Sequence, residues 1–71
     1  MKKKMLIDGM SCEHCVNHVT VALKELKGVT KVDVNLNAKT AIIEASDDVK
    51  DEDIKFAIDD AGYEVIGIEI I

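Results

Sequence analysis

The sequence of 71 residues contains no proline, tryptophan or arginine, and its only aromatic residues are Phe56 and Tyr63. Without arginine or an aromatic and basic surface, and with a net charge of −5, binding to nucleic acid is not expected. No apolar run approaches the roughly 20 residues of a membrane-spanning helix, which argues against membrane insertion. The basic start is followed by an apolar run too short for a signal peptide, so we expect a cytoplasmic protein.

The scarcity of aromatic residues leaves the core to aliphatic side chains. A hydrophobic content of 48% with 32% charged residues is typical of a folded protein, and the length allows one domain, residues 1–71. The charge is unevenly distributed, with +3 over residues 1–39 and −8 over residues 40–71. Such a dipolar surface can orient a charged protein partner, although it also suits ordinary solvation.

Hydrophobic periodicity divides the first half of the chain into a strand, a helix and a strand. Alternation predicts a strand over 3–8, with Met5 and Ile7 on one face. Apolar residues three and four apart predict a helix over 13–27, with Gly28 as its C-cap glycine. Alternating residues then predict a strand over 29–36, followed by a turn over 37–39.

The second half repeats this order. A strand is expected over 40–45 with Ala41, Ile43 and Ala45 inward, then a helix with an acidic N-cap at 51–53 that runs to about Ala61. Gly62 should cap it, and a strand over 63–70 should place Val65 and Gly67 on the side of Tyr63. The apolar residues then left on the open sheet face are Leu6, Ile42, Ile66, Ile68, Ile70 and Ile71. The order predicts an α+β fold, a ferredoxin-like βαββαβ sandwich with two helices on one face of a four-stranded antiparallel sheet.

Both cysteines, Cys12 and Cys15, lie in one loop that runs into the N-terminus of the first helix. The helix dipole and backbone N–H groups at that position favour thiolates. Two cysteines at this spacing, in a chain without an export signal, indicate metal or redox chemistry rather than a structural disulfide. Two thiolates suit Cu(I), whereas Zn(II) normally requires four ligands.

The redox alternative is weak. A thioredoxin site depends on a cis-proline, and this chain has no proline. Attachment of a c-type haem would need a histidine after the second cysteine, where the chain has Val16.

Several neighbours of the cysteines are candidates for supporting roles. His14 is expected to tune a thiolate rather than to bind metal, and His18 to be an exposed surface residue. Met10 carries a thioether that suits Cu(I), but a methionine between a strand and a helix more often fills the core. Ser11 is expected to cap the helix or donate to the Cys12 sulfur, and Tyr63 should lie at the same end of the sheet as the cysteines.

The stretch Gly9-Met10-Ser11-Cys12-Glu13-His14-Cys15 resembles the G-M-[TS]-C-x-x-C signature of heavy-metal-associated domains. Further similarity lies in Val32-Asp33-Val34-Asn35-Leu36 and Ala61-Gly62-Tyr63-Glu64-Val65. Among members, the chain is most similar to bacterial CopZ-type copper chaperones. Tyr63 matches the aromatic residue that these chaperones place beside the site, and His14 matches a C-x-H-C variant among them. Zinc- or cadmium-specific relatives commonly have an acidic residue where this chain has Ser11.

The resemblance implies Cu(I) bound near-linearly by Cys12 and Cys15, with Met10 in the core beneath them. It implies delivery by ligand exchange to a metal-binding domain of a copper-transporting P-type ATPase, a copper-responsive repressor being another candidate partner. It implies no enzymatic reaction. Two other possibilities are an N-terminal metal-binding domain of such an ATPase and a mercury- or zinc-binding relative. The free protein is expected to be a monomer, with a copper-bridged dimer as the alternative state once Cu(I) is bound.

Overall fold

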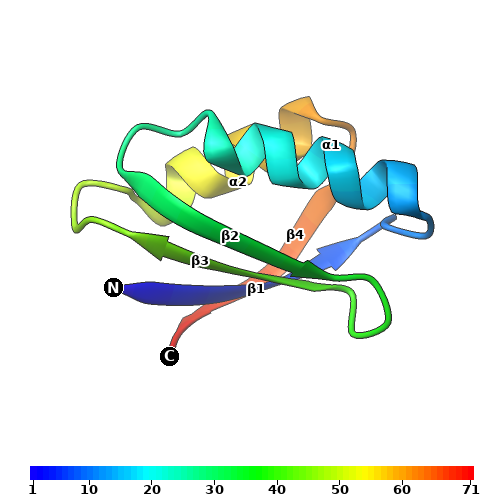
Figure 1. Ribbon diagram of the computed structural model, residues 1–71, viewed down its shortest axis with the longest axis horizontal. Coiled ribbons are helices and arrows are strands. Elements are labelled where there is room, and N and C mark those ends of the chain that lie inside the picture. The colour runs from blue at the N-terminus through cyan, green and yellow to red at the C-terminus, as the bar shows by residue number, and fades with distance from the viewer.

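Strands and helices follow one another along the chain in the order that the hydrophobic periodicity predicts. The computed structural model describes residues 1–71, and its elements are β1 (Lys2–Asp8), α1 (Glu13–Lys24), β2 (Val29–Asn35), β3 (Thr40–Ala45), α2 (Asp51–Asp60) and β4 (Glu64–Ile70). The strands form one antiparallel sheet in the order β2-β3-β1-β4. Both helices cover the same face of this sheet (Figure 1). The predicted ferredoxin-like sandwich is confirmed.

The core lies between the sheet and the two helices and is wholly aliphatic. Met5 of β1 pairs with Ala41 of β3, and alternate residues of both strands point at the helices. The expected inward register of β3 is therefore confirmed. Eleven buried side chains form the core: Met5, Ile7, Met10, Val19, Leu23, Ala41, Ile43, Ala45, Val49, Ile54 and Ile58. Each large aliphatic side chain buried in this way stabilises the fold by about 1.5–3 kcal/mol.

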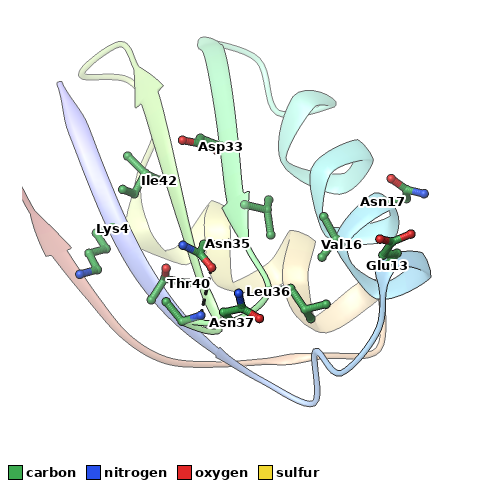
Figure 2. A pocket seen from close by; sticks show the side chains of 12 residues that line it. Lys4, Glu13, Val16, Asn17, Asp33, Asn35, Leu36, Asn37, Thr40 and Ile42 are labelled. Atoms are coloured by element: carbon green, nitrogen blue, oxygen red, sulfur yellow. Dashed lines mark hydrogen bonds between the residues drawn. The ribbon is translucent and has the colours of Figure 1, made fainter.

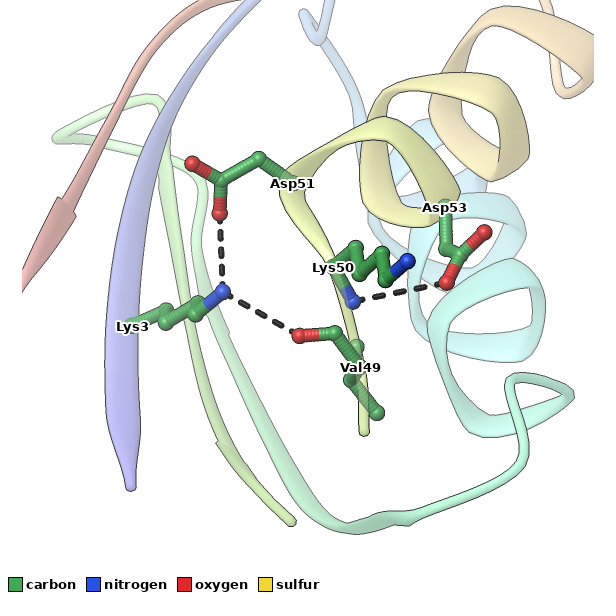
Figure 3. Close-up of polar contacts among 5 residues, drawn as sticks. All are labelled: Lys3, Val49, Lys50, Asp51 and Asp53. Carbon is green, nitrogen blue, oxygen red and sulfur yellow. Dashed lines mark hydrogen bonds and ion pairs between the residues drawn. The ribbon is translucent and has the colours of Figure 1, made fainter. Parts of the chain in front are cut away.

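The start of α2 differs from the expectation that its acidic residues would supply the N-cap. The N-cap is Lys50, whose backbone N–H donates to the Asp53 carboxylate over 3.4 Å. Asp51 lies already inside the helix, and its carboxylate accepts a hydrogen bond of 2.8 Å from the ammonium of Lys3 (Figure 3). The same ammonium donates to the Val49 carbonyl over 3.2 Å and is almost fully buried. Lys3 thus ties β1 to the first turn of α2.

The end of α1 also differs from the expectation. The helix ends at Lys24 rather than at residue 27, and Glu25 closes it, so Gly28 is not its C-cap glycine. Gly28 has a φ of +99° in the turn that leads into β2. A β-carbon there would lie 2.5 Å from the hydroxyl oxygen of Ser46, whose N–H donates to the Gly28 carbonyl. The glycine is therefore required for the close approach of β2 to the end of β3.

A β-bulge in β4 overturns the expected alternation of that strand. Leu6 pairs with Gly67 and Ile7 pairs with Val65, which leaves Ile66 as the extra residue. Beyond the bulge, Ile68 pairs with the buried Met5 and packs against the core, and Gly67 faces away from it. The predicted inward Gly67 and outward Ile68 were therefore wrong.

The bulge also reduces the apolar surface expected on the open sheet face. Ile70 pairs with Lys3, whose side chain reaches α2, and so belongs to the helix side of the sheet. Leu6 and Ile42 do lie on the open face, but their partners across the strands include Thr40 and Lys4. Polar neighbours thus interrupt the apolar residues there.

Candidate metal site

The two cysteines lie where the chain leaves β1 and enters α1. Gly9 turns the chain with a φ of +89°, and Cys12 is the N-cap of α1, with φ −151° and ψ 170°. Cys15 lies in the first turn of the helix, and the N–H of Val16 donates to the Cys12 carbonyl over 3.1 Å. The two sulfur atoms are 3.1 Å apart. The helix start therefore brings the two thiols together at the surface.

The sulfur of Cys12 is the freer of the two. Cys12 is exposed, and its side chain makes no capping hydrogen bond to the helix, although an N-cap side chain commonly does so. Cys15 is half-buried and packs against the core. The site thus combines one exposed ligand candidate with one that packs against the core.

Met10 lies beneath the loop and is only 1% exposed, as part of the core. The structure therefore places it where a packing role requires and away from solvent. Ser11 and His14 are both exposed, and their side chains make no hydrogen bond within the protein. Ser11 is not the N-cap, because the helix begins one residue later than that role needs.

Tyr63 reaches the site from the other half of the chain. Gly62, with a φ of +96°, ends α2 and donates its N–H to the Asp59 carbonyl, and the N–H of Tyr63 donates to the Ile58 carbonyl. This pair of bonds is a Schellman motif, which fixes the direction of the chain as it leaves a helix. A β-carbon built on Gly9 would lie 3.6 Å from the Tyr63 ring. The aromatic side chain is thereby set beside the cysteine loop.

Hydrogen bonds to the Cys15 sulfur alter the acidity of both partners. Donation from the Tyr63 hydroxyl, then the hydrogen bond with Cys12 and that with the backbone of Ser11, lowers the pKa of Cys15 from 9.0 to about 6. The same bond raises the pKa of Tyr63 from 10.0 to about 12, because the hydroxyl keeps the proton that it shares with the sulfur. The site therefore presents Cys15 as a thiolate near neutral pH.

His18 is the residue whose position the sequence did not reveal fully. It is exposed, as expected, but its Nδ1 lies 3.5 Å from the Tyr63 hydroxyl oxygen. The spacing of three residues between Cys15 and His18 shows that they share a helix face. Only the placement of Tyr63, 45 residues further along the chain, gives His18 a partner there.

No third ligand accompanies the sulfurs. The chain contains no group of three or more His, Cys, Asp or Glu side chains arranged to hold a metal ion. A hollow of about 760 Å³ runs along the β2–β3 hairpin and the start of α1, and neither cysteine lines it (Figure 2). The chemistry of the site thus rests on two thiols near the surface.

None of the helices has the length and apolarity that crossing a membrane requires.

These features define a small α+β domain with a two-thiol site at a helix start, and the comparisons with known proteins agree. The model of the heavy-metal-associated domain family matches residues 4–64. The chain is 45% identical over 65 residues to the copper chaperone CopZ of Bacillus subtilis, covering 90% of this chain and 94% of that protein. It therefore belongs to the heavy-metal-associated domain family.

Two solved structures place the fold within the same family. A CopZ metallochaperone superposes with a TM-score of 0.89 at 37% identity, covering 93% of this chain and 100% of the other. A copper-binding domain from the P-type ATPase HMA7 superposes with a TM-score of 0.86 at 38% identity, covering 99% and 100%. Free chaperones and transporter domains thus share this architecture.

Proposed function

We propose that this protein is a cytoplasmic copper chaperone, which binds Cu(I) through Cys12 and Cys15 and passes it to another protein. The observation that carries the proposal is the pair of sulfurs 3.1 Å apart with no third ligand beside them. Soft thiolates in low number favour Cu(I), whereas a zinc site would need two further ligands. The similarity to copper chaperones over nine-tenths of the chain supports the same metal.

Near-linear coordination requires the two sulfurs to move apart. A metal–sulfur distance of about 2.3 Å places the sulfurs of a linear site about 4.6 Å apart, against the 3.1 Å of this structure. Cys12 can supply this movement, since its exposed side chain makes no capping bond to the backbone of α1, whereas Cys15 is half-buried against the core. Binding therefore needs a side-chain rotation of Cys12 and no change in the fold.

Transfer follows from the low coordination number. A thiolate of the partner attacks Cu(I) from the exposed side of Cys12, and a three-coordinate bridged state forms. One sulfur of the chaperone leaves as a thiolate, a second thiolate of the partner binds in its place, and the other sulfur then leaves, so that Cu(I) keeps at least two ligands throughout. The Tyr63 hydroxyl stabilises the negative charge that returns to Cys15. Because only metal–sulfur bonds are exchanged, the protein does not act as an enzyme.

We propose a metal-binding domain of a copper-transporting P-type ATPase as the acceptor, because one such domain has the same fold and 38% identity. A copper-responsive repressor is a second candidate. Met10 supports the site as packing beneath the loop, and Ser11 and His14 act from the surface around the sulfurs.

We also propose that the metal-free protein is a monomer and that Cu(I) can bridge two copies through their exposed sulfurs. Sedimentation that showed a monomer in both states would refute the bridged dimer.

The decisive experiment is a titration of Cu(I) against a competing chelator, with Zn(II) in parallel. The wild type should compete for Cu(I) far better than for Zn(II), and Cys12→Ser should lose that competition. Val21→Ala is the matched control, since Val21 is an exposed residue of the same helix with no contact to the site. Unchanged Cu(I) binding in Cys12→Ser, or much tighter binding of Zn(II) by the wild type, would reject the copper proposal.

A further inference from the structure

The contact between His18 and Tyr63 lies outside the ligand pair and has no role in the function proposed above. The contact joins the Tyr63 hydroxyl oxygen to Nδ1 of His18, and the two atoms are 3.5 Å apart. The Tyr63 ring also lies beside the cysteine loop, 3.6 Å from a β-carbon built on Gly9, and its hydroxyl lowers the pKa of Cys15. Cys15 and His18 lie on one face of α1, so both side chains project toward the same side of the helix as this hydroxyl.

The number of protons available decides how these three groups can bond. A tyrosine hydroxyl has a single hydrogen to donate, while its oxygen can accept a further bond. A cysteine sulfur bound to a metal has no proton and can only accept. When the hydroxyl hydrogen points at Cys15, the bond to His18 forms only if Nδ1 carries a hydrogen and donates it to the Tyr63 oxygen.

We propose that His18 is a positioning residue, which holds the Tyr63 hydroxyl on the Cys15 sulfur by donating an Nδ1–H hydrogen bond to the hydroxyl oxygen. The donation polarises the hydroxyl and keeps it from turning toward solvent. Charge-assisted bonds of this kind strengthen one another along a chain.

The consequence for copper transfer rests on the proposed function. A sulfur that leaves Cu(I) takes up negative charge, and a fixed donor stabilises that charge without reorientation. Loss of one hydrogen bond of ordinary strength corresponds to a change of roughly two- to tenfold. Since His18 acts through Tyr63, we expect His18→Ala to slow transfer of Cu(I) by about two- to fivefold.

The first test needs no copper. Nitrogen-15 NMR of the imidazole rings, at about pH 8 where an ordinary histidine is neutral, distinguishes hydrogen on Nδ1 from hydrogen on Nε2. We expect the Nδ1–H form for His18 in the wild type and its loss in Tyr63→Phe. His14, which has no such partner, supplies the internal reference. An Nε2–H form of His18 in both proteins would overturn the proposal.

The second test is a double-mutant cycle on the rate of Cu(I) transfer to a chelator. His18→Ala should slow transfer in the wild-type background and change it by less than about twofold when Tyr63 is already phenylalanine. His18→Asn, which can place an amide N–H near the position of Nδ1, should restore most of the rate. Val21→Ala controls for truncation on the same helix.

The outcomes separate this proposal from the proposed function. An equal effect of His18→Ala in both backgrounds would show that His18 acts without Tyr63, and no effect in either would show that it does not act. Both results overturn the proposal while copper binding stands. A wild type that holds no Cu(I) refutes the chaperone function, and the tautomer of His18 then decides on the positioning role alone.

Discussion

The Tyr63 hydroxyl is the largest source of the low pKa of Cys15, and its removal gives a sharp prediction. Tyr63→Phe deletes one oxygen and keeps the ring that lies against Gly9. A hydrogen bond to a charged group corresponds to about one to two pH units in the acidity of that group. We therefore expect the pKa of Cys15 to rise from about 6 to between about 7 and 8.

The size of this change is easily measured near neutral pH. With a pKa of about 6, Cys15 is about nine-tenths thiolate at about pH 7, and in Tyr63→Phe the fraction should fall to between about one-half and one-tenth. The carbon-13 shift of the Cys15 Cβ against pH reports this thiol separately from Cys12. The rate of alkylation at one pH is less informative, because a more basic thiolate is also more nucleophilic.

A matched control deletes a hydroxyl elsewhere. Thr30 donates to the Glu44 carbonyl on exposed strands, so Thr30→Val should leave the Cys15 midpoint unchanged. A Cys15 midpoint that stayed near 6 in Tyr63→Phe would refute our assignment of the shift to the hydroxyl.

The same shift makes the stability of the metal-free protein depend on pH. Because folding lowers the pKa of Cys15 below 9.0, its contribution is fully present above about pH 9 and is lost as the pH falls through about 6. The free energy of unfolding of the wild type should therefore rise with pH over this window. The free energy of unfolding of Tyr63→Phe should rise less over the same pH range. Parallel curves for the two proteins would contradict our assignment of the Cys15 shift to the Tyr63 hydroxyl.

Three further pairs of substitutions test the packing of the fold. Met10→Ala should cost about 2–5 kcal/mol in urea unfolding, because Met10 is fully buried, whereas Met10→Leu should cost less than about 1.5 kcal/mol and retain Cu(I) binding. Gly28→Ala should destabilise more than Gly62→Ala in the same assay: a positive φ penalises both by about 1–2 kcal/mol, but only at Gly28 does the new β-carbon meet a serine side chain. Asp51→Asn should destabilise more than Lys3→Met, since it leaves a buried ammonium without its carboxylate, and the opposite order would contradict the role given to that pair.

Periodicity predicted the sheet well where strands are regular. In β3, the small and branched residues Ala41, Ile43 and Ala45 alternate without interruption, and all three are buried as expected. In β4 the alternation fails, because one extra residue at Ile66 exchanges the faces of Gly67 and Ile68. A bulge leaves no signature in a run of aliphatic residues, since both registers offer apolar side chains to the core.

Helix ends were predicted only where local chemistry decides them. Gly62 ends α2 through bonds within the adjacent turn, and the sequence contains that information. Gly28 has its positive φ within a local turn as well, which the Val29 N–H closes by donating to the Leu26 carbonyl, but its nearness to Ser46 depends on the pairing of β2 with β3. The same holds for the site. The position of the cysteine loop could be predicted from the sequence, but the contact of His18 with Tyr63 could not, because it depends on how the two halves of the chain pack together.

Cys12 occupies the N-cap of α1, where a metal ligand is needed for the proposed function but a capping side chain would stabilise the helix better. The first N–H groups of α1 receive no bond from this side chain, whereas serine, aspartate or asparagine there would satisfy one of them. Cys12→Ser should accordingly raise the free energy of unfolding of the metal-free protein by about 0.5–1 kcal/mol while abolishing copper binding, and urea unfolding measures this directly. The helix is left short of one bond at its first turn, and that same omission leaves the sulfur free to swing out to a metal. Selection for stability alone would remove the ligand, so its presence records a trade-off in favour of function.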